Sequence, residues 1–77
     1  MRLLNTLKKN RRYRNITQQE LADSTSTTRQ SIHSIENNKS VPSVSLAILI
    51  ADYLKLNVED LFYFDKKKSD QEIFRIF

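Results

Sequence analysis

The chain contains no cysteine and no glycine, and it has only one proline and one histidine. The lack of cysteine excludes disulfides, thiolate zinc sites and cysteine nucleophiles. The lack of glycine excludes a phosphate-binding glycine loop, and one histidine cannot build a metal or catalytic site by itself. Paired carboxylates in an apolar setting are also missing from the pattern. We therefore expect no enzyme, no metal and no cofactor.

Long hydrophobic runs are missing as well. The longest apolar run covers residues 46–51, whereas a membrane span needs about 20 apolar residues and a secretory signal about 7 to 15. We expect a cytoplasmic protein without membrane contact. A chain of 77 residues makes one domain, and about 60% burial on folding leaves such a domain a small core. Size alone therefore favours association with a second copy.

The positive charge is concentrated at the N-terminus. The chain has a net charge of +4, and residues 1–16 contain no acid beside their basic residues Arg2, Lys8, Lys9, Arg11, Arg12 and Arg14. In most proteins, a cluster of basic residues like this one is simply exposed to solvent and has no ligand. It indicates phosphate binding only when an element that reads a nucleic-acid groove accompanies it.

Residues 16–43 predict two short helices joined by a tight turn. Thr17 and Glu20 form a capping-box pattern, in which the threonine oxygen accepts from an amide and the glutamate reaches back. Hydroxyl groups in residues 24–28 compete for backbone hydrogen bonds, which predicts the turn. Thr28 can then cap the next helix. This is the format of a DNA-reading helix-turn-helix.

The second helix of this pair has an apolar and a polar face. Ile32 and Ile35 are three residues apart and are expected to point inward, whereas the outward positions are Arg29, Gln30, His33 and Ser34. Asn37 and Asn38 are expected to end the helix, because asparagine tolerates the left-handed conformation.

Caps and apolar spacing predict three further helices. They cover residues 3–12, Pro42 to Leu54, and a short segment that begins with the capping pattern of residues 57–60. We therefore predict an all-α fold of five helices. We assign residues 1–64 to a DNA-binding domain and residues 65–77 to a C-terminal extension.

The extension contains strongly apolar positions. A polar connector separates residues 61–64 from residues 72–77, and a β-hairpin or a terminal helix are the alternatives for these segments. The side chains of Ile73, Phe74, Ile76 and Phe77 are too apolar to remain exposed in a monomer. We prefer dimerisation over folding back onto the domain as the means of covering them.

An ordered series of motifs resembles the phage-repressor (Cro/cI, or xenobiotic-response-element) helix-turn-helix family. The match spans residues 3–62 and comprises residues 16–22, 29–32, 35–37, Lys39, 42–43 and 58–62. The resemblance implies a compact, lambda-repressor-like five-helix domain in bacteria, phages or plasmids. It further implies a transcriptional regulator, by preference a repressor, that binds a near-palindromic operator in double-stranded DNA as a homodimer.

The resemblance also implies roles for individual residues. Bases would be contacted by Arg29, Gln30 and Ser34, and phosphates by Gln18, Asn37 and Lys39. To these we add Thr28 as an expected phosphate contact and His33, in second rank, as a contact to a base or a phosphate. Arg11 and Glu36 would form a partly buried ion pair between two helices. A guanidinium can bind guanine through two hydrogen bonds and a carboxamide can bind adenine in the same way, which supports the first two assignments. Without the motif, these side chains would be ordinary solubilising residues.

Two matters stay open at this level. The family commonly has glycine where this chain has Ser26, Asn38 and Lys55, and a positive φ would cost little at Asn38 but would strain Ser26 and Lys55. The competing functional hypothesis is an antitoxin-like protein-interaction module that also binds its own promoter.

Overall fold

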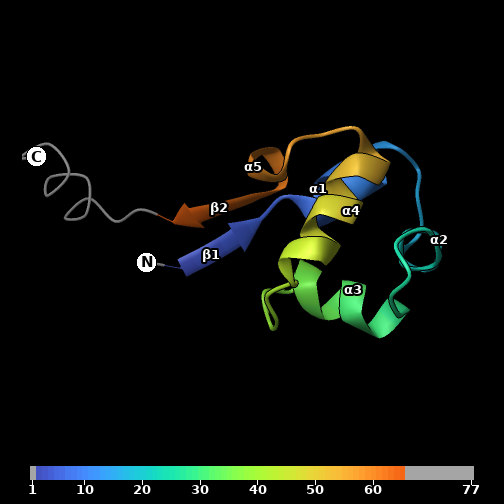
Figure 1. Ribbon diagram of the computed structural model, residues 1–77, viewed down its shortest axis with the longest axis horizontal. Helices are drawn as coiled ribbons and strands as arrows, with labels where there is room; N and C mark the ends of the chain where they lie inside the picture. Colours follow the sequence, from blue (N-terminus) through green and yellow to red (C-terminus); the bar gives the residue numbers. More distant parts are fainter. Residues whose placement is uncertain (1, 66–77) are drawn as a thin grey trace, which may run out of the picture.

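The computed structural model describes residues 2–65, and Figure 1 shows their arrangement. The helices are α1 (Leu7–Tyr13), α2 (Gln18–Ser24), α3 (Arg29–Glu36), α4 (Val44–Leu54) and α5 (Val58–Leu61), and the strands are β1 (Arg2–Asn5) and β2 (Phe62–Asp65). The five predicted helices are therefore present. No helix within residues 2–65 is long and apolar enough to cross a membrane.

The prediction of an all-α fold over residues 1–62 is wrong at its N-terminal end, where Arg2–Asn5 form a strand, whereas a strand after residue 61 was one of the expected alternatives. β1 and β2 form a two-stranded antiparallel sheet in which Arg2 lies opposite Asp65 and Asn5 lies opposite Phe62. Leu3, which was expected to begin the first helix, is instead in this sheet. The helix begins only after Thr6, whose backbone N–H donates to the carbonyl of Leu61 at 2.8 Å. This contact ties the start of α1 to the end of α5.

Only part of the C-terminal predictions concerns residues that the structure describes. Residues 62–65 form a strand, as one alternative required, and this strand pairs with the N-terminal strand. The expected hairpin partner and the expected dimerisation segment both lie outside the described residues.

Two helix starts follow the predicted caps at Thr17 and Thr28, and a cap of the same kind at Ser43 precedes α4. The side-chain oxygens of Thr17, Thr28 and Ser43 each accept from a backbone N–H three residues on, at 3.0, 3.1 and 3.1 Å. The second half of the capping box at Thr17 differs from expectation, because the Glu20 carboxylate accepts from the Tyr53 hydroxyl at 2.9 Å. Glu20 thereby connects α2 to α4.

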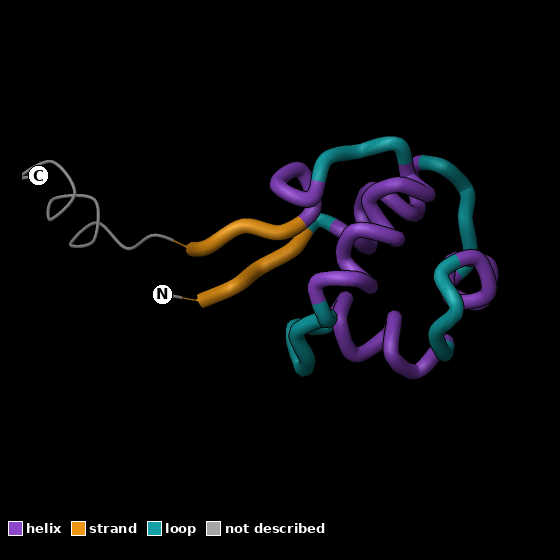
Figure 2. The backbone as a smooth tube through the Cα atoms, viewed as in Figure 1, coloured by secondary structure: helices purple, strands orange, loops and turns teal. Residues whose placement is uncertain are grey.

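The core lies among the five helices, which Figure 2 shows as purple tubes. Every helix contributes at least one fully buried large side chain, and these are Leu7, Leu21, Ile32, Ile50, Leu54 and Leu61. Burying one such side chain stabilises a fold by about 1.5–3 kcal/mol. The positions expected to point inward in α3, Ile32 and Ile35, are both buried.

The turns adopt the geometry that glycine usually provides. Ser26, Asn38 and Lys55 all have positive φ, at 58°, 59° and 61°, and Asn15 at 57° is a fourth such position. Lys55 ends α4 in the left-handed conformation, and the N–H of Leu56 donates to the carbonyl of Ala51 at 2.9 Å. The chain therefore keeps these turns at the expense of backbone strain at Ser26 and Lys55.

Candidate nucleic-acid interface

The turn between α2 and α3 fixes how α3 is presented. Thr25 ends α2 and is buried, and its hydroxyl donates to the carbonyl of Leu21 at 2.7 Å. The N–H of Thr27 donates to the carbonyl of Ala22 at 3.0 Å, with Ser26 in the left-handed conformation between them. Thr25 and Thr27 are therefore both hydrogen-bonded to α2. These contacts fix the position of the first turn of α3 relative to α2.

Most of the predicted base-contacting and phosphate-contacting residues are on the surface. The exposed ones are Thr28, Arg29, Gln30, His33, Asn37 and Lys39, whereas Gln18 and Ser34 are half-buried. The hydroxyl of Thr28 is already occupied, since it accepts from the N–H of Ser31 and donates to the Ser31 hydroxyl. Its side chain therefore acts first as a helix cap.

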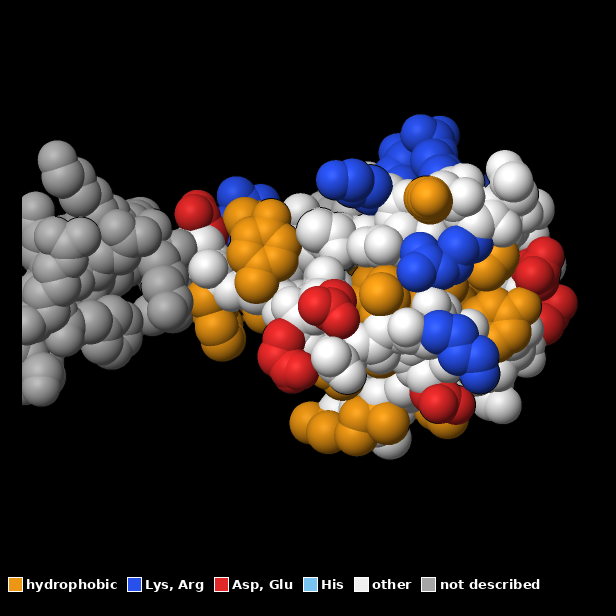
Figure 3. Space-filling model, turned by 90° about the horizontal axis from the view of Figure 1, so that it is seen from above, with side chains coloured by type: hydrophobic (Ala, Val, Ile, Leu, Met, Phe, Trp, Pro, Cys, Tyr) orange, Lys and Arg blue, Asp and Glu red, His pale blue; other side chains and the backbone are white. Residues whose placement is uncertain are grey.

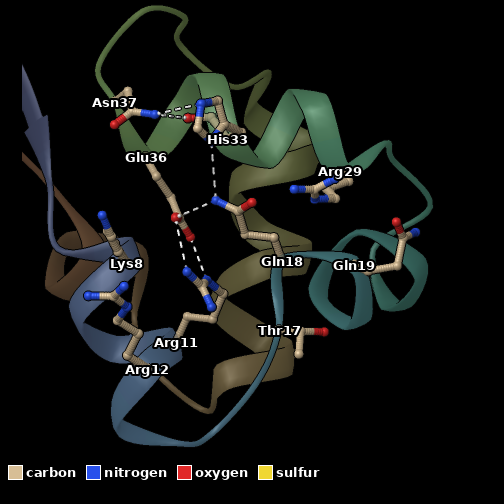
Figure 4. Close-up of a pocket in the computed structure, with 10 residues that line it drawn as sticks. All are labelled: Lys8, Arg11, Arg12, Thr17, Gln18, Gln19, Arg29, His33, Glu36 and Asn37. Atoms are coloured by element: carbon tan, nitrogen blue, oxygen red, sulfur yellow. Dashed lines mark hydrogen bonds and ion pairs between the residues drawn. The ribbon is translucent and has the colours of Figure 1, made fainter.

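A groove of about 510 Å³ lies between α1, α2 and α3. Figure 4 shows that it brings together four of the predicted DNA-contacting residues, namely Gln18, Arg29, His33 and Asn37. Arg29 also lines a smaller hollow of about 240 Å³ together with Gln30 and His33. Thr28, Ser34 and Lys39 do not line either hollow.

Four residues of this groove were not assigned individually from the sequence: Lys8 and Arg12 from α1, which were named only as members of the basic cluster, and Thr17 and Gln19 from the start of α2. Lys8 and Arg12 are four residues apart in α1, so they lie on the same helix face. That spacing was the available signal, because the N-terminal charge cluster alone did not indicate which cations face α3. Figure 3 shows Lys and Arg side chains from the upper edge of the helical body down across its middle, with Asp and Glu side chains to either side.

An ion pair forms the floor of the groove. The Nε of Arg11 lies 2.7 Å from Oε2 of Glu36 and its Nη2 lies 3.2 Å from Oε1. The two side chains are only 9% and 1% exposed, and Arg11 also donates to the carbonyl of Ile16 at 2.7 Å. This bidentate arrangement joins α1 to α3. Removal of one partner from such a buried pair costs about 3–5 kcal/mol.

Gln18 is attached to this ion pair. Its Nε2 donates to Oε1 of Glu36 at 3.0 Å and lies 3.5 Å from Nδ1 of His33. Asn37 lies on the other side of the imidazole, where its Nδ2 is 3.1 Å from Nε2 of His33 and donates to the His33 carbonyl at 3.0 Å. A continuous series of polar contacts thus runs from α1 through Glu36 and Gln18 to His33 and Asn37 (Figure 4).

The described residues contain no cluster of acidic, histidine or cysteine side chains that could hold a metal ion. Residues 2–65 instead present cations and side-chain amides around a floor whose single carboxylate, Glu36, is neutralised by Arg11. Hydrogen-bond donors and positive charge together suit phosphate oxygens and base edges.

The two short helices, the tight turn and the exposed face of α3 define a helix-turn-helix fold. A family model described as helix-turn-helix matches residues 7–61, and the chain belongs to this Cro/cI-like family.

Known proteins of similar sequence carry the same description. The chain is 39% identical over 61 residues to an uncharacterized HTH-type transcriptional regulator of Methanocaldococcus jannaschii, a match that covers 79% of this chain and 92% of the relative. It is also 39% identical over 54 residues to an uncharacterized HTH-type transcriptional regulator of Archaeoglobus fulgidus, covering 70% and 76% of the two chains.

A crystal structure of a candidate DNA-binding protein from Bacteroides fragilis has the same fold. Its TM-score is 0.73 at 24% identity, over 79% of this chain and 98% of that chain. Family membership therefore supports DNA-binding regulation as the coarse function of the chain.

Proposed function

We propose that this protein is a sequence-specific transcriptional regulator that places α3 in the major groove of double-stranded DNA. The observation that carries the proposal is the pair Arg29 and Gln30, which lie exposed in the first turn of α3 beside the basic groove. The N-terminal residues of a recognition helix are those that reach base edges in this class of complex. Arg29 would bind guanine and Gln30 adenine, each through two hydrogen bonds. Ser34, one turn after Gln30, is the third proposed base contact.

The phosphates on either side of the recognition helix would be bound by the rim of the groove. Lys8 and Arg12 supply charge from α1, and Asn37 and Lys39 follow α3 on the exposed surface. Thr28 remains a proposed phosphate contact through an oxygen that its role as a helix cap leaves accessible. These contacts would fix the orientation of α3 without reading sequence.

We further propose that the regulator is a homodimer and that its operator is near-palindromic. A single recognition helix reads few bases, whereas two copies related by a two-fold axis read half-sites about 10 to 10.5 base pairs apart. An apolar groove of about 330 Å³, lined by Leu3, Val41, Val44, Ile48 and Phe62 among others, is the surface proposed for a second copy. Val41, Val44 and Ile48 are 71%, 77% and 53% exposed in the single chain.

The apolar residues of the C-terminal extension support this choice of occupant. The groove includes Phe62, at the start of β2, and the chain continues beyond Asp65 with the apolar segment of residues 72–77. Such a segment from a second copy offers the apolar surface that the groove would bury. Repression is the proposed outcome, because a dimer that occupies its operator blocks access of other proteins to the same DNA.

Selection of bound fragments from random duplex DNA tests the proposal. The expected result is a short inverted repeat that is bound in the nanomolar range and far more tightly than random DNA. Recovery of unenriched random sequences would contradict sequence-specific regulation. A unique site without two-fold symmetry would contradict the homodimer and leave specific binding in place.

A further inference from the structure

The orientations of two side-chain amides around His33 are fixed by their other partners. A carboxylate only accepts hydrogen bonds, so Gln18 must turn its Nε2 toward Oε1 of Glu36, 3.0 Å away. A carbonyl also only accepts, so Asn37 must turn its Nδ2 toward the His33 backbone oxygen, 3.0 Å away. Both amides consequently present N–H groups to the imidazole, one to each ring nitrogen.

A neutral imidazole cannot accept from both of them, because one ring nitrogen is an acceptor and the other carries a proton. The contact from Asn37 to Nε2 measures 3.1 Å and the contact from Gln18 to Nδ1 measures 3.5 Å. The shorter contact has ordinary hydrogen-bond length and the longer one does not. The two lengths favour the tautomer in which Nε2 accepts and Nδ1 carries the proton. In this tautomer the Nδ1–H of His33 and the second N–H of Gln18 are two donors 3.5 Å apart.

The family resemblance already implies a phosphate contact for Gln18, and we propose that His33 joins it in a phosphate clamp, in which one non-bridging oxygen of a DNA phosphate accepts from both side chains. An oxygen at about 2.9 Å from each nitrogen fits between donors at this separation. The clamp rests on the DNA-binding function proposed above, and it assigns His33 to the backbone rather than to a base.

The charges around the clamp favour an anion. Lys8, Arg12 and Arg29 line the same groove. The one acid in that groove, Glu36, is held by Arg11 through two hydrogen bonds. Glu36 and Asn37 position this clamp, since Glu36 orients the Gln18 amide and Asn37 donates to Nε2 of His33.

The tautomer of the free protein is the first test. The chain has one histidine, so a nitrogen-15 spectrum of its imidazole, recorded where the ring is neutral, is free of overlap. The expected result is a protonated Nδ1 and an unprotonated Nε2. Protonation of Nε2 would overturn the clamp, whether or not the protein binds DNA.

Matched variants test the clamp on DNA. The amide nitrogen of asparagine can occupy the position of Nδ1, whereas glutamine places its amide near the position of Nε2. We expect His33→Asn to stay within about threefold of wild type on the selected operator. His33→Ala and His33→Gln should each lose about ten- to a hundredfold, as for a hydrogen bond to a charged group. Equal affinities for all four proteins would overturn the proposal.

Neutral methylphosphonate linkages then locate the contacted phosphate. One linkage per half-site should weaken wild type and leave His33→Ala unaffected by the same replacement. If the variant and wild type respond equally at every linkage, His33 contacts no phosphate.

A titration with inorganic phosphate separates the clamp from the proposed function. Phosphate, but not chloride at the same ionic strength, should shift the Nδ1 resonance of His33 and the side-chain amide of Gln18. These shifts without specific DNA binding would refute the regulator and retain the clamp. Specific DNA binding without these shifts, and with an unaffected His33→Ala variant, would refute the clamp and retain the regulator.

Discussion

Arg11 and Glu36 face each other across the base of the groove, with Nε of the guanidinium 2.7 Å from Oε2 of the carboxylate. The pair joins α1 to α3, and its second carboxylate oxygen holds Gln18. The same two side chains therefore support the fold and orient a residue of the proposed DNA-binding surface.

The first prediction concerns the energetic coupling of this pair. Arg11→Met and Glu36→Gln should each lower the free energy of unfolding by about 3–5 kcal/mol, because each leaves a buried polar partner without its counterpart. The double variant should lose less than the two single losses together. Urea unfolding of the four proteins measures the coupling, and strict additivity would show that the two residues are energetically independent.

The second prediction concerns the turns without glycine. Ser26→Gly and Lys55→Gly should each raise the free energy of unfolding by about 0.5–1 kcal/mol, since relief of left-handed strain exceeds the entropy that glycine adds to the unfolded chain. Asn15→Gly is the matched control at a similar φ of 57°, and it should change little because asparagine tolerates this conformation. Thermal unfolding measures all three, and destabilisation by Lys55→Gly would contradict strain at that position.

These turns illustrate what local sequence reveals. Thr17 and Thr28 were recognisable as caps because a cap and its amide are three residues apart. Ser26 and Lys55 were recognisable only by comparison with the family pattern, which has glycine there.

Features that depend on distant contacts were not visible in the same way. Leu3 and Leu4 fit the apolar stripe of a helix, but strand pairing with residues near the other end of the described chain places them in β1. Gln18 matched a phosphate contact by position, whereas its hydrogen bond to Glu36 depends on how α2 packs against α3. The residues of the candidate site were thus accessible from the pattern, and the contacts among them were not.

The third prediction concerns the apolar groove. Ile48→Glu should convert the proposed dimer to a folded monomer, because Ile48 lines the groove and is 53% exposed in the single chain. Ser45→Glu is the control, since Ser45 is an exposed residue of the same helix that lies outside this groove. Sedimentation at micromolar concentration should report a dimer for wild type and Ser45→Glu only.

Removal of residues 66–77 tests the partner segment. Truncation should weaken the dimer if the apolar residues near the C-terminus fill the groove of a second copy. A truncated chain that still dimerises through Ile48 would remove the extension from the interface, and a full-length chain that is monomeric both free and on its selected site would overturn the dimer.

The fourth prediction concerns the cations of α1. Lys8→Gln and Arg12→Gln should each weaken operator and random DNA about equally and reduce the slope of log K against log salt by about 0.9, as loss of one phosphate contact does. Lys55→Gln is the control, because Lys55 lies at the end of α4 and outside the groove. A salt slope unchanged by Arg12→Gln would show that Arg12 does not meet the backbone.

Sequence reading by Arg29 is the most direct point at which the proposed function can fail. Arg29→Ala should cost about 1–3 kcal/mol on the selected operator and relax preference for one base pair, with little loss on random DNA. Arg29→Lys, which keeps the charge but not the two parallel hydrogen bonds, should lose the same preference. The measurement is the affinity of wild type and both variants for the operator, for operators changed at single base pairs, and for random duplex DNA. An equal loss on operator and random DNA, with base preference unchanged, would contradict base reading by α3.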